Sequence, residues 1–149
     1  GSEQIAPVTK PPAVPDGLPL GDASAYSTFI APQKDWQLQG FELEMAAEPD
    51  GSVPVAIVNR SGLGMYVVYN QQQFPQYLEW RMMGEGQYAV GIEPCTNTFG
   101  RAIARERGQI ITLQPGEKRV YDLEIGVLDG AAAIEQFRQR VGALVTGLR

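Results

Sequence analysis

The sequence predicts an all-β protein, an antiparallel β-sandwich that ends in a C-terminal amphipathic helix. Short apolar runs alternate with polar residues at a period of two, and Gly, Pro and Asn residues separate the runs. This pattern is typical of half-buried strands joined by turns. Seven such runs favour a sandwich over alternating β-α units: residues 41–45, 53–59, 65–69, 77–83, 88–93, 109–113 and 118–127.

The C-terminal segment, residues 129–149, has a different period. Asp129 precedes the run Gly130-Ala131-Ala132-Ala133, and it is the expected N-cap of a helix. Packing of this helix on the sandwich is favoured over a helix that binds a partner. Its apolar residues form one stripe at helical spacing: Ile134, Phe137, Val141, Leu144, Val145 and Leu148.

The N-terminal segment, residues 1–36, is predicted to be a proline-rich extended arm. Residues 3–22 hold five of the eleven prolines. Since proline fixes φ and lacks an N–H donor, this stretch is expected to run extended against a surface rather than as a central strand. Gly1-Ser2 resembles the remnant of an expression tag. The expected organisation is therefore an arm over 1–36, a sandwich over 37–128 and a helix over 129–149.

Composition argues against several classes of partner. The net charge of −5 and the pI near 4.7 disfavour nucleic acid and anionic membranes, which select basic surfaces. The first twenty residues are polar and proline-rich, so we expect no signal peptide, and no apolar run is long enough to span a membrane. A single cysteine, Cys95, is compatible with a reducing compartment, and a cytoplasmic location is expected.

The chain contains no histidine. This composition removes the usual acid–base group at neutral pH, the commonest metal ligand and every Ser-His or Cys-His nucleophile. We therefore expect neither a metal site nor a cofactor. Chemistry in this chain has to use carboxylates, Lys, Tyr or Arg, or residues supplied by another chain.

Glu93 is the first candidate for chemistry. Under strict alternation it shares a sheet face with Ala89 and Gly91, whose small side chains leave a depression beside the carboxylate. Pro94 is expected to end strand pairing at this point. From the pattern alone, a solvated residue at the end of a strand is favoured over a ligand contact.

Two further segments carry candidate contacts. Trp80 is either a platform for the apolar face of a sugar or a core residue packed with its face neighbours Leu78 and Met82. Arg81, on the other face, is either a ligand contact or a surface partner for an acid. The segment 100–108 holds three arginines and forms either a rim over the depression or a solvated loop, with Arg101 the favoured contact.

The runs EWRMMGEGQYAVGIEPCTN, GRAIARERG and LQPGEKRVYDLEIGVLDG resemble an uncharacterised family of aldose-1-epimerase-like proteins. So do the segments VAIVN (55–59) with GLG (62–64), and FPQYLEWR (74–81). The resemblance covers residues 41–130 and implies the C-terminal half of a galactose mutarotase-like β-sandwich. In such enzymes a glutamate on the concave face acts as general base on the anomeric hydroxyl of a sugar. Glu93 matches that base, and four residues would line or rim the sugar site: Trp80, Arg81, Asn97 and Arg101.

The resemblance also implies a missing acid. Mutarotases use a histidine from an earlier part of the chain to protonate the ring oxygen, and this chain has none. The chain is therefore expected to be inactive alone and to pair with the N-terminal half of the same protein or with a second copy. The alternative function is a non-catalytic carbohydrate-binding or sensing domain.

Overall fold

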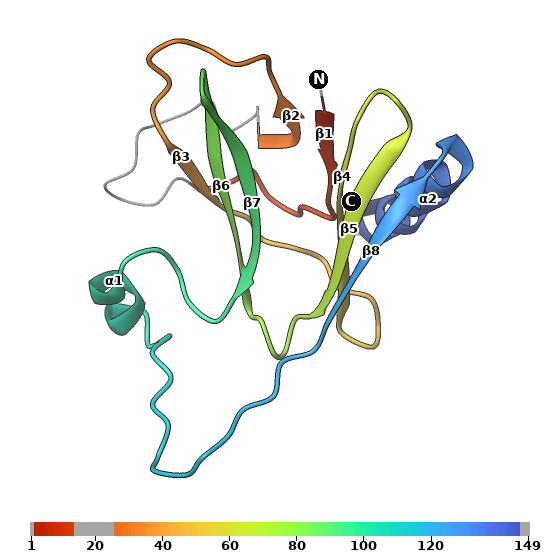
Figure 1. Cartoon of the computed structure of the whole chain (residues 1–149). Helices are drawn as coiled ribbons and strands as arrows, with labels where there is room; N and C mark the ends of the chain where they lie inside the picture. Colours follow the sequence, from red (N-terminus) through yellow and green to blue (C-terminus); the bar gives the residue numbers. More distant parts are fainter. Residues whose placement is uncertain (1, 14–25, 147–149) are drawn as a thin grey trace.

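The computed structural model describes residues 2–13 and 26–146 as two antiparallel β-sheets with two helices (Figure 1). No helix in these ranges is long and apolar enough to cross a membrane. The elements follow one another along the chain as β1 (Ser2–Ile5), β2 (Thr28–Phe29), β3 (Gln39–Glu42), β4 (Ser52–Val58), β5 (Leu63–Asn70), β6 (Gln76–Gly84), β7 (Gln87–Cys95), α1 (Arg101–Glu106), β8 (Leu123–Asp129) and α2 (Ala131–Thr146).

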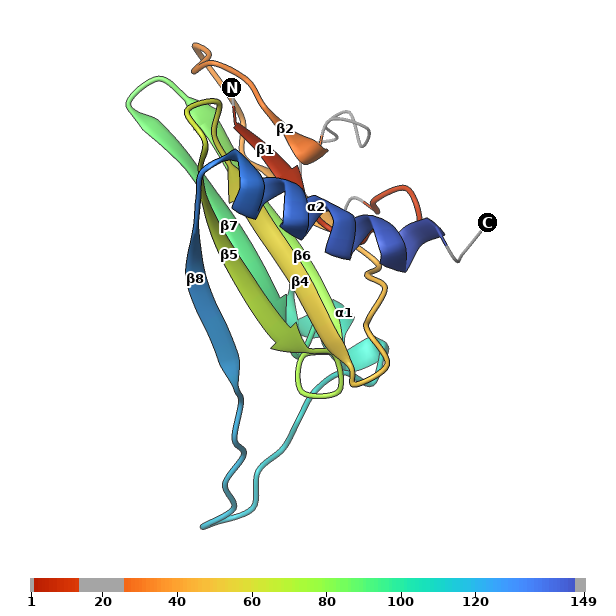
Figure 2. The ribbon, with the colours of Figure 1, turned by 90° about the vertical axis from the view of Figure 1, so that its right-hand side faces the viewer.

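The larger sheet has the strand order β2-β1-β4-β5-β8, and α2 lies across one of its faces (Figure 2). The predicted apolar stripe of the helix makes this contact, because Ile134, Phe137 and Val141 are buried against the sheet. The Phe137 ring lies 5.7 Å from that of Tyr66. Packing of an amphipathic face supplies most of the stability of such a helix. The helix is therefore part of the fold, as expected from its spacing.

The smaller sheet has the order β3-β6-β7, and it packs on the other face of the larger sheet. The core between the sheets is formed by the inward residues of the strands and their extensions: Phe41, Leu43, Met45, Val53, Val55, Tyr69 and Tyr77. Every strand pair is antiparallel. The predicted all-β antiparallel sandwich with a C-terminal helix is confirmed.

The N-terminal segment differs from the prediction of an arm without a central strand. β1 lies inside the larger sheet, where it pairs with β2 on one side and β4 on the other. The prolines begin only at Pro7, so residues 2–5 keep all their N–H donors and can complete two ladders. Residues 7–13 then run beside β3, where Thr9 N–H donates to Glu44 O over 2.9 Å. Residues 14–25 lie outside the described ranges.

The segment after β7 also differs from the prediction. Residues 101–106 form α1 instead of a loop, and residues 109–113 form no strand. Of the predicted strand 118–127 only the second half is paired, from Leu123 onward. Ile110 and Leu113 are 41% and 50% exposed, so nothing among the described residues covers this segment. An alternating pattern alone does not form a strand without a neighbour to pair with.

The start of α2 corrects a smaller prediction. Asp129 is the last residue of β8, paired with Leu63, and it does not cap the helix. Gly130, with φ of 86°, turns the chain instead, and its carbonyl accepts the N–H of Ile134 over 3.3 Å. The predicted stripe residue Leu148 lies outside the described residues.

Candidate functional site

The candidate site is the face of the smaller sheet that points away from the larger sheet. Antiparallel register places directly paired residues on the same face. Trp80 on β6 pairs with Gly40 on β3 and Gly91 on β7, so a glycine lies on each side of the indole. One row along, Leu78 pairs with Glu42 on β3 and Glu93 on β7. The open face thus carries an aromatic side chain framed by glycines, beside a row with two carboxylates.

The opposite face of β6 forms the core. Tyr77, Glu79, Arg81 and Met83 are each no more than 2% exposed. Trp80, by contrast, is half-buried. The side chain of Trp80 lies on the face away from the core between the sheets, together with Leu78, which is only 5% exposed. The strict alternation of a paired strand causes this division.

Glu93 is half-buried on the open face, near the C-terminal end of β7. Partial burial raises the pKa of its carboxyl above the ordinary glutamate value. Its side chain folds back along the strand and lies over Gly91. A Cβ placed on Gly91 would be 3.3 Å from Cγ and 3.1 Å from Cδ of Glu93. The carboxylate therefore lies toward the row that contains Trp80 and not out beyond the end of the strand.

Pro94 does not end the pairing of β7, contrary to the prediction. It pairs with Tyr77, and Cys95 continues the ladder opposite Gln76. β7 is the edge strand of its sheet, so a residue without an N–H can be placed there without loss of a ladder hydrogen bond. Glu93 is thus held inside a paired strand, which gives it a more defined position than a residue at a frayed end.

Glu42 and Arg107 belong to the site and were missed in the sequence. Nη1 of Arg107 contacts both carboxylate oxygens of Glu42, at 2.8 and 3.1 Å. Arg107 directly follows α1, a helix on the side of the smaller sheet away from the larger one (Figure 1). The three-arginine segment was the available signal, but the favoured residue was Arg101. Only the tertiary structure shows which arginine reaches an acid on β3.

The other predicted contacts lie farther along the same connection. Arg101 is exposed at the first position of α1. Asn97 lies in the turn between β7 and α1, where Nδ2 donates to Thr98 O over 2.9 Å and Oδ1 accepts from Thr96 Oγ1 over 3.2 Å. The hydrogen bonds of the Asn97 side chain are local, and neither residue has a described contact with Trp80 or Glu93.

Arg81 does not share the face of Glu93, which corrects its prediction as a sugar contact. It is 2% exposed, and its Nε lies 3.5 Å from Oε1 of Glu79 inside the sandwich. The guanidinium also stacks near the rings of Phe29 and Phe41, at 5.1 and 5.8 Å. Nη2 donates to Thr28 O, so the side chain joins β6 to β2. Arg81 does pair with an acid, but inside the sandwich and not at the surface, which corrects the other interpretation as well.

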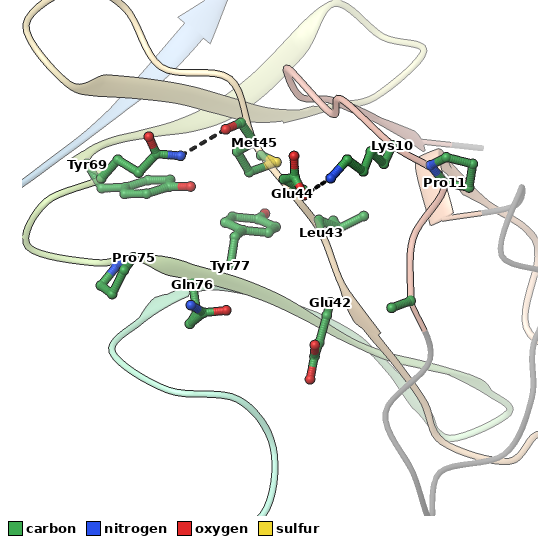
Figure 3. Close-up of a pocket in the computed structure, with 12 residues that line it drawn as sticks. Lys10, Pro11, Glu42, Leu43, Glu44, Met45, Tyr69, Pro75, Gln76 and Tyr77 are labelled. Carbon is green, nitrogen blue, oxygen red and sulfur yellow. Dashed lines mark hydrogen bonds and ion pairs between the residues drawn. The ribbon is translucent and has the colours of Figure 1, made fainter. Parts of the chain in front are cut away.

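A hollow of about 390 Å³ opens next to the site, between residues 10–13 of the arm and the first residues of β6 (Figure 3). The rings of Tyr69 and Tyr77 stack inside it at 6.0 Å. Figure 3 shows Glu42 and Gln76 pointing away from these rings, to the other side of the sheet. The ion pair of Lys10 and Glu44, at 2.8 Å, closes part of its rim. This hollow is the open end of the core and not a continuation of the Trp80 face.

Two classes of chemistry find no support in the arrangement. Among residues 2–13 and 26–146, no cluster of three His, Cys, Asp or Glu side chains could hold a metal ion. Burial raises the pKa of the Cys95 thiol to about 11, so it is not an activated nucleophile. Proton transfer by a carboxylate is the chemistry that the open face supports.

Comparison with known proteins agrees with this geometry. A family model described as "Domain of unknown function (DUF4432)" matches residues 1–127. The fold resembles a crystal structure described as "a putative aldose 1-epimerase" from Klebsiella pneumoniae subsp. pneumoniae MGH 78578, with a TM-score of 0.85 and 23% identity. The match covers 97% of this chain and 38% of that one. No curated protein matches in sequence. The likeness establishes an aldose epimerase-like β-sandwich fold.

The buried Glu79 predicts a pH-dependent stability. Burial raises its pKa to about 7, although the Arg81 charge and the Gln4 amide lower it, and an ordinary glutamate titrates at 4.5. Between these values the folded chain holds one proton more than the unfolded chain, so stability falls as pH rises. The loss between pH 4.5 and 7.5 is expected to be about 3 kcal/mol.

Urea denaturation at several pH values measures this loss. We expect Glu79→Gln, a neutral isostere of the protonated acid, to remove that part of the pH dependence. The exposed Glu135→Gln serves as control and should follow the wild type. Equal slopes for wild type and Glu79→Gln would contradict the assignment.

Proposed function

The chain belongs to the DUF4432 family, and from this premise and the geometry of the open face we propose that it binds a sugar there and interconverts its anomers. Glu93 is the general base, and the complete protein carries out the reaction. The observation that carries the proposal is the placement of Glu93 and Trp80 in neighbouring rows of one open face, with glycines beside the indole. The epimerase-like fold supports it.

Each element of the face suits one part of a sugar. The indole of Trp80 offers an apolar surface for the C–H face of a pyranose. The Glu42–Arg107 pair offers both acceptors and donors, so it suits hydroxyl groups. Since the pair is neutral as a whole and Glu93 adds a negative charge, the face favours a neutral aldose over an anionic sugar.

In the proposed reaction, Glu93 removes the proton of the anomeric hydroxyl. The bond between C1 and the ring oxygen breaks, and the ring oxygen takes up a proton from an acid. Rotation about C1–C2 and the reverse steps close the ring as the other anomer. The raised pKa of Glu93 suits this exchange, because a base works best when its pKa approaches the working pH. The chain has no histidine, so we assign the acid to a segment outside this sequence.

The absence of histidine also favours a second candidate, a sugar-binding domain without catalysis. It would use the same face and the same contacts of Trp80, Glu42 and Arg107. The two candidates differ in turnover by the complete protein and not in binding.

We propose further that more β-structure of the same, longer polypeptide covers the free side of β8. Three cross-strand neighbours on the face toward the smaller sheet remain uncovered: Met65, Ile125 and Val127 are 45%, 66% and 66% exposed. Among the described strands, β8 is also a sheet edge with one unpaired side. A long apolar edge strand of this kind requires a cover. The chain spans only 38% of the similar epimerase-like structure, which leaves ample chain for it.

The first prediction of the proposal concerns Glu93. In the longer protein that includes this chain, Glu93→Gln should slow anomer interconversion about 100-fold or more, because the general base is lost. Polarimetry or proton NMR of a freshly dissolved aldose anomer measures the rate. Glu85→Gln, an exposed change in the β6–β7 turn, should leave it unaltered. If Glu93→Gln turns over as fast as wild type, the base assignment is wrong. Sugar binding by the wild type without any turnover would favour the second candidate.

The second prediction concerns the Trp80 platform. Calorimetric titration of this chain with D-glucose and D-galactose should show binding that Trp80→Ala weakens about tenfold, the loss of one aromatic contact. Trp36→Ala removes the other tryptophan, which lies beside Gly84, and should leave the affinity unchanged. Equal weakening by both changes would contradict a specific platform.

The third prediction concerns the cover of β8. Ile125→Lys should cost this chain less than about 0.5 kcal/mol, because the side chain is exposed. In the longer protein the same change should cost about 2 kcal/mol or more, since it would bury a charge in an apolar contact. Urea denaturation of both proteins provides the comparison, with Gln72→Lys in an exposed turn as control. A concentration-dependent dimer of this chain that Ile125→Lys abolishes would instead identify a second copy as the cover.

A further inference from the structure

Gly91 differs from an ordinary strand glycine in what lies above it. A Cβ built on its backbone would meet the Glu93 side chain, with Cδ at 3.1 Å, Cγ at 3.3 Å and Oε1 closer still. The contact with Oε1 is shorter than real Cβ atoms show, so the carboxylate, as the end of a flexible side chain, would have to move aside. The carboxylate of Glu93 occupies the space that every other residue type at position 91 would fill.

We propose that Gly91 is a positioning residue. Because it has no side chain, it leaves a space above the strand, here called the seat, in which the Glu93 carboxylate lies toward Trp80. The inference rests on the proposed function for its consequence, but the seat itself is a property of this chain. Gly91 pairs directly with Trp80, so a carboxylate above Gly91 lies beside the row of the indole. With a Cβ at position 91, the carboxylate would have to leave this space.

The close contact with a neighbouring side chain is found at position 91 and not at Gly84 of the same sheet. Gly84, at the end of β6, has room for a Cβ, with its nearest neighbours at 3.6 Å or more. Ala89 occupies the same face two residues before Gly91 and carries a Cβ without difficulty. The identity of residue 91 is therefore constrained by the side chain two residues later, on the same strand and the same face.

The seat also explains part of the electrostatics of Glu93. A carboxylate that lies down on the sheet is more buried than one that extends outward, and burial raises its pKa. A methyl group at position 91 would lift the carboxylate into solvent and return its pKa toward the ordinary value. One substitution would thus change both the place and the proton affinity of the base, while the carboxylate itself is kept.

A double-mutant cycle on this chain tests the seat without any sugar. The effect of Gly91→Ala on the urea midpoint should differ between the wild-type and Glu93→Ala backgrounds, because only in the first must a carboxylate move aside. Gly84→Ala is the matched control, and its effect should be the same in both backgrounds. Equal effects of Gly91→Ala in the two backgrounds would overturn the proposal. If Gly91→Ala folds poorly, recovery of folding in the Gly91→Ala, Glu93→Ala double variant still tests it.

NMR titration of the glutamate carboxyl carbons gives the second readout. The pKa of Glu93 should fall toward the ordinary glutamate value in Gly91→Ala and stay unchanged in Gly84→Ala. An unchanged pKa in Gly91→Ala overturns the proposal, since a merely structural glycine would give that result.

Turnover by the longer protein separates this inference from the proposed function. If the seat is correct and the proposed function holds, Gly91→Ala lowers kcat more than it raises KM and moves the acid limb of the pH profile downward. The double-mutant cycle and the NMR titration can give the expected results while neither the wild-type chain nor the longer protein interconverts an aldose. In that case the positioning role of Gly91 is supported and the proposed function is wrong.

Discussion

The register of β6 between β3 and β7 is the constraint on which the candidate site depends. Side chains of a strand alternate between two faces, so a slip of one residue would exchange Trp80 for Arg81 on the open face. Burial prevents the slip, because one face of β6 carries Tyr77 and Met83 in the core. The same alternation then places Trp80 between two glycines and Leu78 between two glutamates. The chemistry of the open face is a consequence of what the other face buries.

The buried face includes an unusual element, the ion pair of Glu79 and Arg81 inside the sandwich. A buried pair stabilises a fold weakly at best, because both groups lose their hydration, and burial already raises the pKa of Glu79 to about 7. Here the guanidinium lies near Phe29 and donates to Thr28 O, both in β2. The pair thus ties the smaller sheet to the N-terminal strand pair, and β6 cannot shift its register without stranding a charge.

On the open face, the absence of a side chain matters as much as the residues present. Gly91 leaves the space in which the Glu93 carboxylate lies, and that carboxylate reaches back toward the indole. Arg107, placed by α1, forms an ion pair with Glu42, whereas Glu93 forms none with the residues that the structure describes. In the proposed function these features supply the base of a proton-transfer site and leave its acid to be supplied. The uncovered strand β8 and the missing acid both call for additional chain, which fits a sequence that spans 38% of a similar structure.

The sequence by itself determined the strands from β4 to β7, the helix α2 and the division of β6 and β7 into two faces. These features follow from short-range preferences: alternation, turn residues and helical spacing act within a few residues. Only the tertiary structure decided which face became the core, that β1 entered the larger sheet, and that Arg107 and not Arg101 reached Glu42. It also decided that Arg81 was buried beside Glu79. Each of these depends on contacts between residues far apart in the chain, and a local pattern contains no information about the partner that a side chain will meet.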